Sequence, residues 1–281
     1  QPSKPVVAVI FDFDDTLAPD STSQLLAGLG VDVAEFWRED VAPLVRAGWD
    51  PVPAYLYALL AASRAGRFAQ PLTRDRLDRA GRAIQRYPGV DTLFTRLRDE
   101  AAVDHPGVGI EFYVITSGLE RLVAATRVGR ELTQLWGCEF HYGNSGEALF
   151  PANLVSFTDK TRYLFQIEKG LIAPRTELDA FAVNHKVPEG RERVPFSRMI
   201  YVGDGYTDVP CFSLVGKRGG IPIAVVDHQR RERWGRAWGF IEEQRAMNLC
   251  LTDYAPGGAT ETILRMSLQR ICESIERTGG A

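Results

Sequence analysis

The segment Val6–Leu17 reads VVAVIFDFDDTL, an apolar run followed at once by acidic residues. Six apolar residues in succession, without polar alternation, are typical of a strand that is buried on both faces of a parallel sheet. In an extended chain, residues two apart share a face, so Asp12 and Asp14 are expected to point together while Phe13 enters the core. Carboxylates grouped in this way repel one another and are costly to bury unpaired, so the segment predicts a bound cation.

Other apolar runs end in the same manner, in a polar or glycine-rich cluster. They are residues 110–115 (IEFYVI) before TSG, 198–202 (RMIYV) before GDG, and 221–226 (IPIAVV) before Asp227. Helical patterns lie between these runs, and in the C-terminal tail Leu264, Leu268, Ile271 and Ile275 recur at helical spacing after a PGGAT turn. Alternating strands and helices predict a doubly wound α/β fold, which gathers the carboxyl ends of its strands at one edge.

Residues 20–87 break this alternation. Three stretches in this region have helical patterns, no strand run lies between them, and the region ends at Pro88 and Gly89. We therefore predict a main domain of residues 1–19 and 88–281, with a small all-α domain of residues 20–87 inserted after the first strand. Residues 170–197 form a second irregular stretch, for which a solvated excursion is favoured over a surface subdomain or a subunit contact.

Aromatic and basic side chains are frequent in the helical insert. The prediction is that most of these aromatics pack the helices together, that one or two line a pocket, and that the arginines mainly face solvent. The residues concerned are Trp37, Trp49, Tyr55, Tyr57, Arg38, Arg46 and Arg64.

Composition limits the partners that the chain can have. The 281 residues carry a formal net charge of −3, which provides no general attraction to nucleic acid or to an anionic membrane. In His228–Trp238 arginines alternate with tryptophans; a solvated helix face with tryptophan packed beneath is favoured there over a nucleic-acid surface. No apolar stretch approaches the length of about 20 residues that a membrane span requires. Neither a nucleic acid nor a membrane is therefore expected as a partner.

The cysteines indicate a compartment. Cys138, Cys211, Cys250 and Cys272 are scattered, without a CxxC pair, so they are expected to be buried or free thiols in the cytoplasm. The chain begins at Gln1 rather than at Met, which suggests that it has been trimmed.

A second acidic cluster, YVGDGYTDV, places Asp204 and Asp208 directly after another predicted strand. If the two strands are neighbours, Asp12, Asp14 and Asp204 form an oxygen-rich and incompletely filled site, which suits Mg²⁺ better than Zn²⁺. Neither cluster has the glycine and glutamate spacing of an EF-hand calcium loop.

Two further segments suit an anion. VITSGL places Thr116, Ser117 and Gly118 at a strand end, where hydroxyl and amide groups can bind an oxyanion. Lys160 lies in the first turn of a predicted helix that Thr158 caps, and a lysine there opposes the helix dipole, which favours an anionic partner. A strand-end threonine and a helical lysine are also common without any site.

Taken in order, DFDDT, VITSG, Lys160 and GDGYTD resemble the four motifs of the haloacid dehalogenase (HAD) superfamily, specifically its phosphatase branch. The resemblance spans residues 6–226 and extends to a helical cap like that of phosphoserine phosphatases. It implies a Rossmann-like parallel sheet in which the first strand lies between the strands that carry the second and fourth motifs. The main domain would then be the catalytic core.

The resemblance also implies roles for individual residues. Asp12 would be the nucleophile that takes the phosphoryl group, and Asp14 the general acid and base. Thr116 would bind the transferring phosphoryl group with the neighbouring Ser117 and Gly118, and Lys160 would neutralise it.

The same comparison assigns the acidic residues that remain. Asp204 would complete a Mg²⁺ site with Asp12 and the main-chain carbonyl of Asp14. Asp208 would orient Lys160 or a metal-bound water, and Asp15 would be a bystander.

The implied function is a Mg²⁺-dependent phosphatase that hydrolyses a small soluble phosphomonoester, a phosphorylated metabolite, through an aspartyl-phosphate. Alternatives are a phosphotransferase or phosphomutase that uses the same intermediate, or a binding protein that keeps the fold without turnover. Phosphoserine specificity is not implied, because Asp20 and Ser21 occupy the region where those enzymes have a substrate-reading glutamate. The substrate and the oligomeric state are left open.

Overall fold

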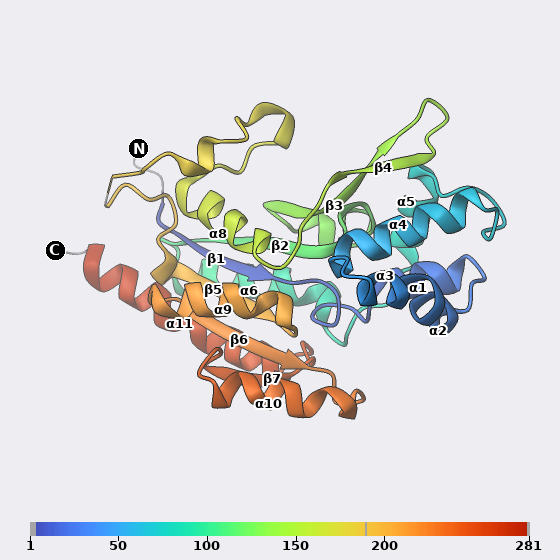
Figure 1. The fold of residues 1–281 in the computed structure, drawn as a ribbon. Coiled ribbons are helices and arrows are strands. Elements are labelled where there is room, and N and C mark those ends of the chain that lie inside the picture. The colour runs from blue at the N-terminus through green and yellow to red at the C-terminus, as the bar shows by residue number, and fades with distance from the viewer. Residues whose placement is uncertain (1–3, 189, 280–281) are drawn as a thin grey trace.

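The computed structural model describes residues 4–188 and 190–279. Within them lies one sheet of seven strands, in which each neighbouring pair is parallel except β4–β3 (Figure 1). Their order in the sheet is β4 (Ala148–Asn153), β3 (Gln134–Tyr142), β2 (Gly109–Leu119), β1 (Val6–Phe11), β5 (Met199–Gly203), β6 (Ile221–Val226) and β7 (Asn248–Leu251). The predicted α/β class is confirmed, as is the place of the first strand between the second and fourth motif strands.

Helices cover both faces of the sheet. Side chains of β1 alternate between two apolar clusters: Val7, Val9 and Phe11 pack in one, and Ala8 and Ile10 in the other. The first cluster includes α6 (Val90–Asp104) and α11 (Ala259–Gly279), and the second includes α8 (Asp159–Lys169) and α9 (Val209–Lys217). The helix expected in the C-terminal tail is confirmed as α11, whose predicted apolar stripe is buried.

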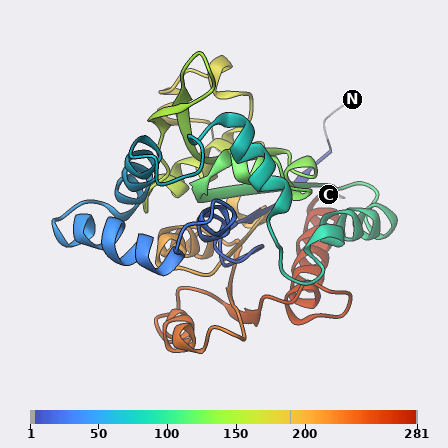
Figure 2. The same ribbon diagram turned by 90° about the vertical axis from the view of Figure 1, so that its right-hand side faces the viewer.

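The region after β1 is helical, as predicted, and lies at the carboxyl edge of the sheet (Figures 1 and 2). It comprises α1 (Ser21–Gly28), α2 (Val33–Glu35), a π-helical turn (Phe36–Val41), α3 (Ala42–Arg46), α4 (Pro51–Arg64) and α5 (Arg74–Ala83). Backbone hydrogen bonds tie it to the β3–β4 hairpin, from Ala148 N to Leu72 O and from Arg74 N to Gly146 O, both at 2.9 Å. The division into a core and a separate cap stays a prediction.

Between α8 and β5 the described residues 170–188 and 190–197 form short 3₁₀ turns and no strand or α-helix. Arg193 holds this segment to Glu111 at the start of β2 with a hydrogen bond of 2.8 Å from Nη1 to Oε2. The segment therefore lies toward the amino ends of the strands, away from the edge that carries the acidic clusters.

The remaining elements complete the layers: α7 (Glu120–Ala124) follows β2, and α10 (Trp234–Glu242) joins β6 to β7. In the part of the chain that the structure describes, none of the helices is both long and apolar enough to cross a membrane. The four cysteines are buried free thiols, as expected.

Candidate active site

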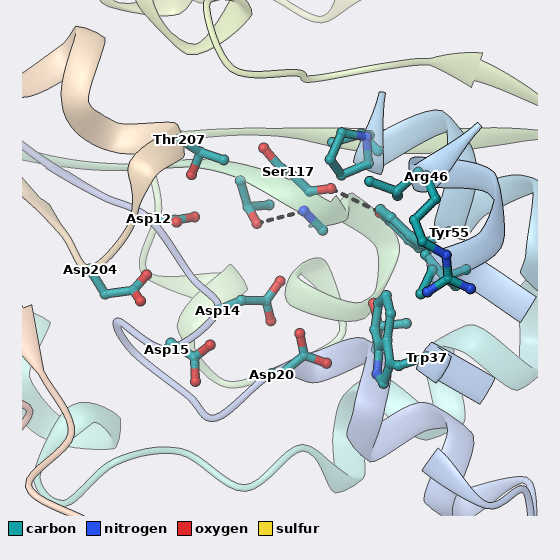
Figure 3. Close-up of a pocket in the computed structure, with 18 residues that line it drawn as sticks. Asp12, Asp14, Asp15, Asp20, Trp37, Arg46, Tyr55, Ser117, Asp204 and Thr207 are labelled. Atoms are coloured by element: carbon teal, nitrogen blue, oxygen red, sulfur yellow. Dashed lines mark hydrogen bonds between the residues drawn. The ribbon is translucent and has the colours of Figure 1, made fainter. Parts of the chain in front are cut away.

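Asp12 and Asp14 follow β1 directly, and both line a pocket (Figure 3). Asp12 is nearly buried, and its Oδ1 accepts a hydrogen bond of 2.7 Å from Phe13 N. Asp14 Oδ1 accepts one of 2.7 Å from Ser21 N, at the start of α1. Because Phe13 is fully buried while both carboxylates line the pocket, the predicted alternation of these three residues is confirmed.

Lys160, in the first turn of α8, is fully buried and contacts the pocket residue Asp12. Its Nζ lies 2.9 Å from Asp12 Oδ2 and 2.7 Å from Asp208 Oδ1, and it donates to Thr207 Oγ1 at 3.2 Å. Tyr201 also donates to Asp208 Oδ1, at 2.7 Å. Burial alone would lower the pKa of Lys160, but the charges of Asp12 and Asp208 outweigh it and raise the pKa, so the amine stays charged.

Burial raises the pKa of carboxyl groups that line the pocket. It raises the pKa of Asp12 to about 7, with Lys160 opposing the shift and Asp208 adding to it. It also raises the pKa of Asp14 well above its ordinary value, helped by the charge of Asp20, and that of Asp204, helped by Asp208. Each shift measures how unfavourable a further negative charge is here, so the site favours a bound cation.

Three carboxylates could hold such an ion. One oxygen from each of Asp12, Asp204 and Asp208 lies within 4.8 Å of the others. A donor set made only of carboxylate oxygens is typical of Mg²⁺ or another hard cation. Asp14 is outside this set, although its predicted contribution was a main-chain carbonyl rather than its carboxylate.

The predicted phosphate-binding segment lies within β2, where the pairing with β3 is interrupted between Ile115 and Leu119. Thr116 is fully buried, and its Oγ1 accepts a hydrogen bond of 2.9 Å from Gly118 N. The hydroxyl of Ser117 is buried and has no hydrogen-bond partner among the described residues. The segment thus offers the unpaired hydroxyl of Ser117, while the amide of Gly118 is already engaged.

Gly118 is required by the close approach of a carboxylate. A Cβ added at this residue would lie 2.3 Å from Asp14 Oδ2 and 3.2 Å from Thr116 Oγ1, and the first of these distances is too short for any side chain. The glycine therefore lets the second motif pack against the first.

The arginines that follow β6 were not predicted from the sequence as site residues. Arg233 Nη1 lies 2.5 Å from Asp15 Oδ2 and 3.4 Å from Asp204 Oδ2, and Arg236 Nη2 lies 3.5 Å from Asp204 Oδ2. Asp15 adopts a positive φ of 55°, uncommon for a residue other than glycine, and its carboxylate meets Arg233. Asp15 therefore has a structural partner in Arg233, and its expected lack of a part in the reaction stays a prediction.

The expected solvated arginine face over packed tryptophans was wrong. Trp234 and Trp238 are 43% and 58% exposed, whereas Arg233 and Arg236 turn inward, because the nearly buried Asp15 and Asp204 require cations. The signal in the sequence was the three-residue spacing of Arg230, Arg233 and Arg236, which places one basic helical face directly after a strand end.

These residues border a pocket of about 560 Å³ between the sheet edge and the helical insert. Its lining comprises Asp12, Asp14, Asp15, Asp20, Thr22, Trp37, Val41, Ala42, Val45, Arg46, Pro51, Val52, Tyr55, Thr116, Ser117, Gly118, Asp204 and Thr207. Of the aromatics named from the sequence, Trp37 and Tyr55 line it, whereas Trp49 and Tyr57 are exposed and pack on each other. The prediction that one or two aromatics line a pocket is confirmed.

No protein-family model matches the chain. An uncharacterized protein of Borreliella burgdorferi is 27% identical over 233 residues, which cover 75% of this chain and 78% of that protein. Among solved structures, a HAD family hydrolase from Salmonella enterica serovar Typhi aligns with a TM-score of 0.59 and 13% identity, over 95% of this chain and 73% of that one.

Two phosphoserine phosphatase structures are similar over almost their full length. A substrate-bound complex aligns with a TM-score of 0.55 and 13% identity, and a phospho-aspartyl intermediate analogue with 0.53 and 14%. Each alignment covers 94% of this chain and 99% of the other. The chain therefore has the haloacid dehalogenase fold, in the form found in phosphoserine phosphatases.

Proposed function

We propose that this protein is a Mg²⁺-dependent phosphatase that hydrolyses a small phosphomonoester through an aspartyl-phosphate on Asp12. The observation that carries the proposal is the buried contact of 2.9 Å between Lys160 Nζ and Asp12 Oδ2, beside a pocket that Asp12, Asp14 and Thr116 line. A nucleophilic carboxylate must meet an anionic phosphoryl group, so it needs a fixed cation beside it. Lys160 supplies that charge.

In the first step an oxygen of Asp12 attacks phosphorus, and the bond from phosphorus to the ester oxygen breaks. Asp14 gives its proton to the departing alkoxide; burial raises its pKa, which favours the acid form that this role requires. In the second step Asp14 takes a proton from water, whose oxygen attacks phosphorus and releases inorganic phosphate from Asp12. Ser117 and Thr116 line the same pocket, and their hydroxyls would contact the phosphoryl oxygens.

The acidic residues fit a magnesium ion. Asp12, Asp204 and the main-chain carbonyl of Asp14 would hold it, and Asp208 would remain with Lys160, to which it is already bonded. When bound, the ion would neutralise charge on the phosphoryl oxygens, in addition to Lys160.

Release of inorganic phosphate tests the proposal. The protein is incubated with Mg²⁺, nitrophenyl phosphate and a panel of phosphorylated metabolites, with Asp12→Asn as the matched blank. We expect release by the natural chain alone. No release from any ester would sink the proposal, and transfer to an added alcohol in preference to water would favour a phosphotransferase instead.

Magnesium should support turnover, whereas calcium should bind and inhibit. Mg²⁺ keeps octahedral geometry at about 2.0–2.1 Å, whereas Ca²⁺ takes about 6–8 oxygens at longer range and can engage both oxygens of Asp12. Phosphate release is measured in each metal, and Ca²⁺ is then titrated against Mg²⁺. Equal rates in the two metals would contradict the assignment of Asp12 as both ligand and nucleophile.

Gly118→Ala should lower phosphatase activity by about 10²-fold or more, because the new methyl group displaces Asp14 from its place in proton transfer. Steady-state kinetics and thermal unfolding of the variant are measured together. Gly107→Ala is the control, since a Cβ there has no atom within 4 Å and φ is not positive. Normal activity of Gly118→Ala would show that the position of Asp14 does not matter.

A further inference from the structure

The part of the pocket that lies away from the acidic residues has an apolar wall. Figure 3 shows Asp12, Asp14 and Asp204 at one end of the pocket, with Trp37 and Tyr55 at the other. The wall side chains all come from the helical insert: Trp37, Val41, Val45, Pro51, Val52 and Tyr55. Trp37, Val41 and Val45 are four residues apart in sequence, so they share one helical face.

The polar atoms of the two aromatic side chains are already engaged within the protein. Trp37 Nε1 donates to Ser23 Oγ at 3.0 Å, and Tyr55 OH donates to Ser117 O at 2.8 Å. What these residues offer a ligand is therefore their ring surface. Asp20, which also lines the pocket, caps α1 through its Oδ1 with a bond of 2.5 Å from Ser23 N. Arg46 lines the outer end and is exposed.

We infer, on the basis of the proposed phosphatase function, that the alcohol portion of the substrate is apolar, with a ring or a branched chain that packs between Trp37, Val41 and Tyr55. A polar alcohol such as serine or glycerol would give up water there without gaining hydrogen bonds from the wall, which is unfavourable. The volume of about 560 Å³ admits a group much larger than a serine side chain.

Kinetics with matched alkyl esters tests this inference. Cyclohexylmethyl phosphate, glycerol 3-phosphate and phosphoserine all release a basic alcohol, so they differ mainly in the apolar surface that they can bury. We expect kcat/KM to be about 100-fold higher for the cyclohexylmethyl ester. A preference for phosphoserine or glycerol phosphate would overturn the substrate class and leave the phosphatase proposal intact, whereas no hydrolysis of any ester would overturn the phosphatase proposal itself.

Two variants test whether the apolar part of the substrate binds at Trp37. Trp37→Ala should raise KM for cyclohexylmethyl phosphate about tenfold more than it raises KM for ethyl phosphate, because only the larger ester reaches the indole. Trp49→Ala is the control, since Trp49 is exposed and does not line the pocket. Equal effects of Trp37→Ala on both esters would contradict the inference. The ester series on the unmodified protein decides the question if Trp37→Ala does not fold.

A second inference concerns the arginines after β6 and rests on different contacts. Arg233 bridges Asp15 and Asp204, and Arg236 approaches the same oxygen of Asp204, Oδ2. Neither arginine lines the pocket. We propose that they are counterions that hold the acidic cluster together when no metal is bound, and that they thereby weaken its affinity for Mg²⁺.

The direction of the effect follows from charge. A divalent cation at Asp12 and Asp204 is repelled by a guanidinium beside Asp204, so removal of the arginine should tighten metal binding. An arginine that instead positioned Asp204 as a ligand would give the opposite result, since its removal would weaken binding.

Calorimetric titration of the metal-free protein with Mg²⁺ alone separates these cases. Arg233→Gln and Arg236→Gln should each lower the Mg²⁺ dissociation constant by about tenfold. Arg231→Gln is the matched control: it removes the same charge from the same segment, but Arg231 is exposed and lies over Trp234. Unchanged or weaker binding in both test variants would overturn the proposal, and Arg236→Gln alone suffices if Arg233→Gln does not fold.

Discussion

Asp12→Asn is expected to abolish turnover of every phosphate ester, by at least about 10⁴-fold, because a neutral amide cannot form the aspartyl-phosphate. The asparagine side chain has nearly the same shape as that of aspartate. Lys160 keeps its contact of 2.7 Å with Asp208, and burial already disfavours the charge of Asp12, so the variant should still fold. Phosphate release and the unfolding midpoint are measured on the same preparation, so that loss of chemistry is separated from loss of structure.

A matched carboxylate elsewhere provides the control for Asp12→Asn. Asp227 follows β6 as Asp12 follows β1, yet it does not line the pocket and accepts hydrogen bonds from Tyr87 and Gln229. Asp227→Asn should therefore keep its turnover. Rapid trapping with labelled substrate should find phosphate on the natural chain and none on Asp12→Asn; a labelled Asp12→Asn protein would place the nucleophile on another residue.

The central strands were predictable because each is buried on both faces. β1, β5 and β6 consist almost wholly of buried residues, so an uninterrupted apolar run was enough to identify them. β3, β4 and β7 were not identified. β4 is an edge strand with exposed Leu149 and Phe150, and β7 has only four residues, so neither shows a continuous apolar run.

The predicted site residues share a property that the sequence reveals: each lies in a short polar motif at a strand end or a helix start. Asp12, Asp204 and Thr116 are brought together by the parallel order of β2, β1 and β5, which such a fold enforces. The bond from Tyr55 to Ser117 and the ion pair of Arg233 join segments far apart in sequence. Those contacts depend on how the helical insert and the β6–β7 connection pack at the carboxyl edge of the sheet. A local sequence pattern does not predict that packing.

The hydrogen bonds of Asp14 explain why its substitution should be selective. Oδ1 accepts from Ser21 N, and Oδ2 lies against Gly118, so an amide at this position can be accommodated without a change of partner at Oδ1. Asp14→Asn should then keep the pocket intact and lose only proton transfer. General acid catalysis contributes about 10²–10⁴-fold where the leaving oxygen is basic.

Asp14→Asn should accordingly lose that whole factor with an alkyl phosphate, while nitrophenyl phosphate, whose phenolate leaves readily, should still phosphorylate Asp12 at nearly the normal rate. Hydrolysis of the intermediate should then be slow, because the variant lacks the carboxylate that deprotonates the attacking water. Stopped-flow absorbance should record a rapid burst of nitrophenol followed by slow steady turnover. If Asp14→Asn slowed the burst by the factor that it imposes on the alkyl ester, Asp14 would be acting in position or charge rather than in proton transfer.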